Sequence, residues 1–361
     1  MGISNLPLAE KTNIKKWAFE DLVLTDVSLP AVDVSALDLS DNSILMIDGH
    51  IVHHQVDPKI RLDIDVKNHV AADNKLLVLN EEKRNSVLKI TVPQNATVET
   101  PLSIIVIAKD RSLVHHSEVI LETGASLKLT ENFIGQGAFN ANIVSQLHVG
   151  ENANLTTNTI NELAPGTVVY HHKYADVSAH GVIDATNFMI NDTDLVFEDL
   201  AYLNGRGSEA ETKTVSIASA GQKQNLTIRI ENVAPRSIGN IINYGITKDT
   251  AHLAFNGVGK IQKDAKDCDN QQETRLLNLS KTAEAVANPF LLIDEGDITA
   301  GHAASIGQLD EEQIYYLMSR GMSRAEASKM IVAGFLTPFV DALEDETMRE
   351  SLAARIEAKL G

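Results

Sequence analysis

The segment GASLKLT at residues 124–130 combines a glycine, which permits a sharp turn, with side chains that alternate along a short strand. Three similar segments follow it: GENANLT (150–156), GVIDATN (181–187) and GSEAETKTV (207–215). Their glycines are 26, 31 and 26 residues apart, and Gly257 lies 50 residues after Gly207, close to two further periods. One coil of a β-helix needs two or three short strands with turns, so this period favours a β-helix. An ordinary β-sandwich is the competing interpretation.

Further short alternating segments lie between residues 71 and 280, where proline is scarce and Asn, Gly, Asp and Ser mark turns. They include SVLKITV, TVSIAS, NLTIRI and HLAFNGVGKI. Residues 1–70 are mixed, with a helix-compatible start and then NSILMIDGHIVHHQ, which is typical of paired strands. We therefore expect three regions: a mixed region at 1–70, an all-β core at 71–280, and a helical region at 281–361.

The helical prediction for the C-terminal region depends on capping signals. Asp310 and Gln313 fit a capping box before EEQIYYLMSR, and Gly321 follows as a stop signal. Ser323 and Glu326 fit a second capping box, and Pro338 lies beyond the expected end of that helix. A last helix carries an apolar residue at every fourth position: Met348, Leu352, Ile356 and Leu360. This stripe suits packing on the chain itself or, less favoured, on a partner.

Composition excludes several classes of protein. A net charge of -18 disfavours binding to nucleic acid or to an anionic membrane, because phosphate contacts need clustered Lys and Arg. One cysteine, Cys268, excludes a disulfide framework and a metal site built only from this chain's thiols. No apolar secretion segment or membrane span is evident, so we expect a cytoplasmic protein.

Motifs for self-contained catalysis are missing from the sequence. GVGKIQ at residues 257–262 has neither the spacing nor the Ser/Thr of a phosphate-binding loop, and no G-x-S-x-G segment occurs. Cys268 lies among acidic residues, which disfavour a reactive thiolate, so an incidental strand or turn position is the preferred interpretation. We expect that the protein is not an enzyme.

Histidines are the remaining candidates for chemistry. Three adjacent pairs occur, at His53–His54, His115–His116 and His171–His172. Neighbouring side chains of a strand point to opposite faces, so such a pair cannot chelate one ion together, and structural roles are favoured. His302 follows the acids Asp294, Glu295 and Asp297, a ligand mixture that iron or zinc accepts. From spacing alone, however, this segment is typical of a loop leading into a helix.

Several motifs in the last third of the chain resemble the SufB/SufD family of the SUF iron–sulfur cluster assembly machinery. They occur in the family's order: Gln272, Leu276, Leu277 and Ser280; then Pro289, Leu291 and Ile293; then HAASIGQLD and IYYLMSRG. The match is strong from about residue 251 to 336, and Trp17 and Leu22 fit a Trp-containing segment near the N-terminus. A single cysteine favours the SufD branch, because SufB-type chains carry several.

The resemblance implies a right-handed parallel β-helix flanked by N- and C-terminal helical regions. It implies a non-catalytic scaffold that pairs with a SufB-type partner through the β-helices and docks a SufC-type ATPase on its C-terminal helices. The positions matching the docking motif are Tyr315, Tyr316, Leu317, Arg320 and Gly321.

His302 matches the family histidine at the contact between the two scaffold chains, which is implicated in cluster formation. The family's neighbouring cysteine and serine are replaced here by Ala300 and Gly301. No cofactor is therefore expected to bind stably, and transient iron or a cluster would need sulfur ligands from the partner. Two alternatives stay open: a homodimeric scaffold or binding module, and a polysaccharide-active β-helix enzyme.

Overall fold

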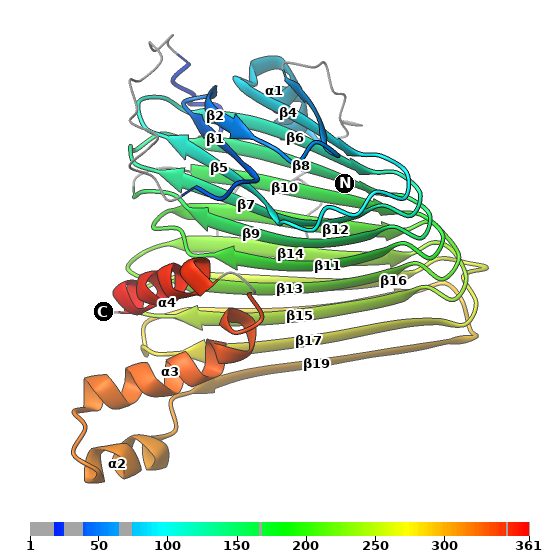
Figure 1. Ribbon diagram of the computed structural model, residues 1–361. Helices are drawn as coiled ribbons and strands as arrows, with labels where there is room; N and C mark the ends of the chain where they lie inside the picture. Colours follow the sequence, from blue (N-terminus) through cyan, green and yellow to red (C-terminus); the bar gives the residue numbers. More distant parts are fainter. Residues whose placement is uncertain (1–17, 25–38, 65–73, 166–167, 344–345, 361) are drawn as a thin grey trace.

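The computed structural model describes residues 18–24, 39–64, 74–165, 168–343 and 346–360 (Figure 1). The described residues form a parallel β-helix of about eight turns, so the predicted fold class is confirmed. Each coil contributes one strand to each of two facing sheets, which we call sheet A and sheet B. Trp17, which the sequence matched to a family segment, lies outside the described residues.

In the described residues, sheet A has ten strands, in the spatial order β19-β17-β15-β13-β11-β9-β7-β5-β1-β2. Their bounds are β1 Ser43–Ile47, β2 His50–Gln55, β5 Leu102–Ala108, β7 Ser126–Gly135, β9 Asn154–Glu162, β11 Val182–Met189, β13 Glu209–Ala218, β15 Ile238–Thr247, β17 Cys268–Asn278 and β19 Ile298–Gln308.

Sheet B has nine strands within the part of the chain that the structure describes, in the spatial order β18-β16-β14-β12-β10-β8-β6-β4-β3. Their bounds are β3 Arg61–Ile64, β4 Ser86–Val92, β6 Leu113–Leu121, β8 Ala141–Val149, β10 Val168–Val177, β12 Asp194–Leu203, β14 Lys223–Asn232, β16 His252–Ile261 and β18 Glu284–Ile293.

Residues with positive φ recur at the same corner of successive coils and stack in a column along the β-helix. The backbone N–H of each donates to a carbonyl of the next coil, at 2.8–3.1 Å, with φ between 54° and 71°. The column consists of Asn95, Gly124, Asn152, His180, Gly207, Arg236 and Asp267. Two of the four predicted glycines therefore occupy the repeating position itself, where a residue without Cβ is unstrained.

In-register stacking of aliphatic side chains forms the core between the two sheets. Leu121, Val149, Val177 and Leu203 are paired in this way along sheet B, and all four are buried. Because successive side chains alternate between faces, each coil adds another aliphatic layer with little need for aromatic residues. This arrangement agrees with the low aromatic content of 4%.

Short helices cover the outer faces of the sheets. Helix α1 (Lys75–Lys83) lies on sheet B, where Leu76 and Leu77 pack against Tyr170. Helices α3 (Arg324–Val340) and α4 (Glu346–Leu360) lie on sheet A (Figure 1). Helix α2 (Glu311–Ser319) precedes them and follows β19. No helix in the described ranges has the length and apolar character needed to span a membrane.

The apolar stripe of the last helix packs on its own chain, as favoured from the sequence. Leu352, Ile356 and Leu360 are buried in one cluster with residues of α3 and the outer face of sheet A. Tyr244 of that face contacts the rings of Phe335 and Phe339, at 4.7 and 4.6 Å between centroids. The C-terminal helices are thus part of the folded body.

Three details of the sequence interpretation need correction. The region predicted as helical from residue 281 begins with two further strands, β18 and β19, and its first helix starts at Glu311. The region predicted as strands contains helix α1, whose N-cap Asn74 accepts a hydrogen bond from Leu76 N–H. Pro338 lies inside α3 rather than beyond it, because burial of Leu336 and Phe339 on sheet A keeps the last turn helical.

The two ends of the β-helix differ. At the N-terminal end, β2 pairs antiparallel with β1, and β3 pairs antiparallel with β4, so both sheets finish on strands of reversed direction. At the other end the sheets finish on β18 and β19, each paired in the described residues with only one neighbour. We call this second end the open end.

Candidate functional site

The open end presents the last coil of the β-helix to solvent. Strand β19 runs parallel to β17, and β18 runs parallel to β16. Ile293 on β18 and Ile306 on β19 lie on the inner faces of their strands but are 36% and 51% exposed, whereas most aliphatic strand residues of earlier coils are buried. Unpaired strand edges with exposed aliphatic side chains are a template for pairing with another chain.

His302 lies in the middle of β19, on the face that points toward the interior of the β-helix. Its in-register neighbour on β17 is Gln272, and the same face of β17 carries Leu276, which belongs to the main core. Ala300 and Ala304 share this face of β19, because side chains two residues apart lie on one side. The imidazole is exposed, since the described chain places no further coil over β19.

The position of His302 in a strand corrects the interpretation from spacing alone, which placed it in a loop. The segment ITAGHAASI is rich in small residues with little strand preference. The strand conformation is stabilised instead by pairing with all eleven residues of β17. The alternation of Ile298, Ala300, His302, Ala304 and Ile306 was the sequence signal for this strand.

The two residues where the chain departs from the family pattern lie on opposite faces of β19. Ala300 is on the inner face with His302 and packs against Cys268, the chain's own thiol, which is buried. Gly301 is on the outer face, where a Cβ would lie 2.6 Å from Oε1 of Gln271. The glycine therefore makes room for the Gln271 side chain.

The fold does not place the acidic residues that precede His302 next to its side chain. Asp294, Glu295 and Asp297 lie in the turn between β18 and β19, and His302 is five residues further along an extended strand, about 16 Å away. Glu295 accepts backbone N–H groups of Asp264, Gly296 and Asp297, at 3.0, 2.9 and 3.4 Å. These hydrogen bonds hold the pKa of Glu295 below its usual value.

Two of the three histidine pairs divide between the two faces of their strands, as expected for strand neighbours. His115 and His171 point into the core, where both rings contact Phe133 edge-on. His116 and His172 lie on the outer face of sheet B. His53 and His54 lie on β2, at the opposite end of the β-helix from His302. No three His, Cys, Asp or Glu side chains among the described residues are arranged to hold a metal ion.

Cys268 is a satisfied core residue. Its Sγ lies 3.3 Å from the Ser237 hydroxyl and 3.3 Å from the carbonyl of Ala234, and the side chain packs with Ile261, Ala265 and Ile298. The incidental strand position inferred from the sequence agrees with its place at the start of β17.

Helix α2 presents the second exposed apolar surface. Its inward residue Ile314 is buried, whereas Tyr315 and Tyr316 are 75% and 56% exposed. The guanidinium of Arg320 lies 5.2 Å from the Tyr316 ring centroid. A bidentate ion pair between Arg324 of α3 and Glu311 of α2, at 2.9 and 2.6 Å, ties the two helices together.

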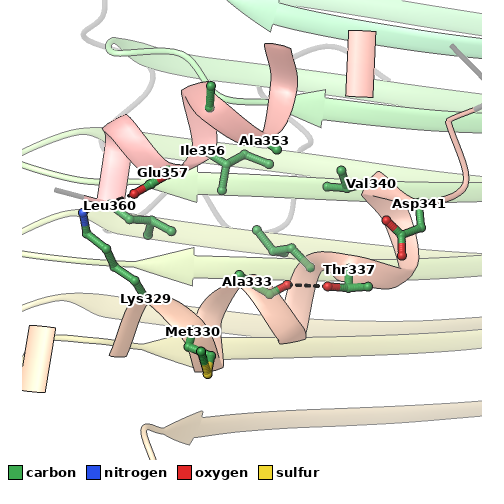
Figure 2. Close-up of a pocket in the computed structure, with 12 residues that line it drawn as sticks. Lys329, Met330, Ala333, Thr337, Val340, Asp341, Ala353, Ile356, Glu357 and Leu360 are labelled. Atoms are coloured by element: carbon green, nitrogen blue, oxygen red, sulfur yellow. Dashed lines mark hydrogen bonds and ion pairs between the residues drawn. The ribbon is translucent and has the colours of Figure 1, made fainter. Parts of the chain in front are cut away.

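Beside this surface, α3 and α4 enclose an apolar groove of about 610 Å³ (Figure 2). Met330, Ala333 and Thr337 line it from α3, and Ala353 and Ile356 line it from α4. Met330 is also 53% exposed.

We call Tyr315, Tyr316, Met318 and Met330 the helical patch. Tyrosine, methionine and arginine are enriched at protein interfaces. The sequence motif had identified the tyrosines and Arg320, whereas the exposure of Met318 and Met330 depends on how α2 meets α3 and could not be inferred from it.

Comparison with known proteins agrees with the motifs. Residues 104–335 match the family model described as SUF system FeS cluster assembly, SufBD core domain. The chain is 36% identical over 304 residues to the iron-sulfur cluster assembly protein SufD of Bacillus subtilis, covering 82% of this chain and 69% of that protein.

Two staphylococcal relatives are more distant. Iron-sulfur cluster assembly SufBD family proteins of Staphylococcus epidermidis and Staphylococcus saprophyticus are each 26% identical over 281 residues. These matches cover 76% of this chain and 60% of each relative.

Proposed function

Because the chain belongs to the SufB/SufD family of the SUF system, on its SufD side, we propose that it is a non-catalytic cytoplasmic scaffold subunit for iron–sulfur cluster assembly. In this proposal it acts in a complex with a SufB-type scaffold and a SufC-type ATPase. The observation that carries the proposal is the open end, where His302 lies on the inner face of an edge strand that has no outer neighbour in the described chain.

The open end suits pairing with a second β-helix. Strands β18 and β19 can each continue their sheet with a parallel or antiparallel strand, and backbone hydrogen bonds would give the pairing its register. Ile293 and Ile306, which lie on the inner faces of β18 and β19, would lose their exposure in the process. A SufB-type chain is the partner we propose, and a second copy of this chain is the alternative that the experiment below distinguishes.

His302 would supply half of a shared site for iron or the nascent cluster, which is cargo rather than a resident cofactor. A neutral imidazole is a ligand for iron, and thiolates are the usual ligands of clusters. Ala300 contributes no thiol, and Cys268 is buried with its sulfur hydrogen-bonded. The sulfur ligands would therefore come from the partner across the open end.

The helical patch is the proposed docking surface for the ATPase. It combines two exposed tyrosines and two exposed methionines on a helix pair that starts at Glu311, three residues after β19 ends at Gln308. Movement of α2 and α3 driven by ATP hydrolysis in the partner would thus act next to the strand that carries His302. This chain contributes no phosphate-binding loop to that step.

Co-expression tests the proposal. A tag on this chain should retain SufB and SufC from the same cell in fixed stoichiometry through size-exclusion chromatography. A chain that elutes as a homodimer, with neither partner retained, would favour the alternative and remove the heteromeric scaffold.

A further inference from the structure

Three charged side chains lie inside the central coils of the β-helix, away from the open end. Glu131 on β7, Lys173 on β10 and Asp199 on β12 all point into the core. Glu131 and Lys173 are fully buried, and Asp199 is 3% exposed. Burying a charge is unfavourable by several kcal/mol unless an opposite charge and hydrogen bonds compensate it.

Lys173 and Asp199 compensate each other through one side chain. Nζ of Lys173 donates to Oδ1 of Asn187 and to Oγ1 of Thr159, each at 3.1 Å. Nδ2 of the same Asn187 donates to Oδ2 of Asp199 at 2.8 Å. Lys173 and Asp199 are therefore linked by hydrogen bonds through Asn187, and this link compensates the burial of the carboxyl group.

Glu131 has weaker partners. Its Oε1 accepts from the Ser117 hydroxyl at 2.7 Å and, more distantly, from Ser145 at 3.4 Å. Its Oε2 is buried and has no hydrogen-bond partner among the described residues. Along sheet A its in-register neighbours are Ile104 and Thr159, neither of which carries charge.

The other titratable groups that face this part of the core, among the described residues, cannot supply a positive charge. These are His115 on β6 and His171 on β10. Burial lowers the pKa of His115 to about 3, and burial also lowers the pKa of His171 well below its usual value. Both imidazoles are neutral near pH 7, so two carboxyl groups share one ammonium.

We propose that Glu131 is an un-ionised carboxylic acid in the folded protein at neutral pH, and that its ionisation at higher pH destabilises the central coils. Ionisation would leave a charged, buried Oε2 without a donor, whereas the acid leaves only one O–H without an acceptor. Burial raises the pKa of Glu131 more than Ser117, Lys173 and Ser145 lower it. Burial also raises the pKa of Asp199, but Lys173 and Asn187 oppose it there.

The sign of the pH dependence follows from the raised pKa. Between the ordinary value of 4.5 and the folded value, the folded state binds a proton that the unfolded chain has released. The stabilisation that the protonated Glu131 side chain gives to the folded state is therefore lost as pH rises through this window. Each pH unit should increase the unfolding equilibrium constant about tenfold relative to a variant without the ionisable group.

Infrared spectroscopy of the intact chain at pH 8 gives the first test. Exposed carboxyl groups are ionised at this pH, so a residual carbonyl band of an un-ionised carboxylic acid should be visible in the wild type. The band should disappear in Glu131→Gln and remain in Asp199→Asn. No such band in the wild type would overturn the proposal, and it would point instead to an ionised Glu131 with a bound cation.

Unfolding experiments supply the second test with the same two variants. Glu131→Gln keeps the Ser117 hydrogen bond, so at pH 8 it should resist urea at least as well as the wild type, and its advantage should shrink toward pH 5. Asp199→Asn removes the carboxylate that compensates Lys173. This variant should unfold at a lower urea concentration than the wild type at every pH between 5 and 8. Equal destabilisation by both variants at pH 8 would contradict the assignment of the proton to Glu131.

Discussion

His302 on β19 and Gln272 on β17 are in-register neighbours on the inner face of sheet A. Gln272 is 5% exposed and its Nε2 donates to the carbonyl of Phe290 on β18, at 2.8 Å, so it links the two sheets just beneath the open end. His302 occupies the same position one coil further out, where the described chain offers no cover. Because β19 is the last strand of sheet A in the described chain, a position that is buried in the preceding coil is exposed at His302.

Introducing a charge at the edge should block pairing at the open end. Ile306→Lys places an ammonium on the inner face of β19, where a paired β-helix would bury it. We expect affinity for the proposed SufB-type partner to fall by about tenfold or more, as 1.4 kcal/mol corresponds to tenfold. Ile238→Lys on the outer face of β15 is the matched control, and an equal loss in both variants would argue against the open end.

If the helical patch docks a SufC-type ATPase, as proposed, truncating the patch should release that ATPase while leaving the β-helix intact. Tyr315→Ala combined with Tyr316→Ala removes two exposed rings, and aromatic residues at interface centres contribute about 2 kcal/mol or more. Retention of a SufC-type partner should drop about thirtyfold or more in a quantitative pull-down. Val78→Ala, an exposed position on α1, should retain it.

Helix α4 should be held to sheet A mainly by its apolar stripe. Leu352 is 1% exposed within the cluster shared by α3, α4 and sheet A. Leu352→Ala should reduce the free energy of unfolding of this region by about 2–4 kcal/mol. Hydrogen exchange of the α4 amides measures this change in free energy. Glu350→Ala, at an exposed position of the same helix, is the control. Unchanged exchange in Leu352→Ala would contradict this packing.

Acid should destabilise the core through His115. Burial lowers the pKa of this imidazole in the folded chain to about 3, against 6.5 ordinarily. Its contribution is therefore fully present above pH 6.5 and is lost as pH falls toward 3, up to about 5 kcal/mol. Urea unfolding between pH 7 and 4 should show a smaller loss of stability for His115→Gln than for the wild type. Equal slopes in the two proteins would contradict the assignment.

Much of the fold could be predicted because its repeat is local. Gly124 and Gly207 occupy the corner column, where the backbone needs positive φ, and their separation of 83 residues (207 − 124) spans three coils. The column could not be followed through Asn152 and Arg236, because residues with side chains also adopt this conformation there. Gly257 fitted the expected period, but it does not belong to the corner column. It lies inside β16, next to the Gln272 side chain.

The site was less predictable from local pattern. Spacing placed His302 in a loop, since the small residues around it have weak strand preference and the pairing with β17 is non-local. The family motif marked His302 as a candidate, which stays a prediction, and it did not indicate that the side chain lies on the inner face of β19 or that it is exposed. Glu131 carried no sequence signal, because its burial depends on coils that meet only in the folded chain.

The central claim is that His302 acts in cluster formation and is not needed to hold the assembly together. The direct measurement is the iron and sulfide content of the purified complex with SufB and SufC, made with His302→Ala and with the surface control His148→Ala. We predict the same subunit composition for both, and at least about tenfold less cluster with His302→Ala, as expected for loss of a ligand or its orientation. Cluster content equal to the wild type in His302→Ala would contradict the claim.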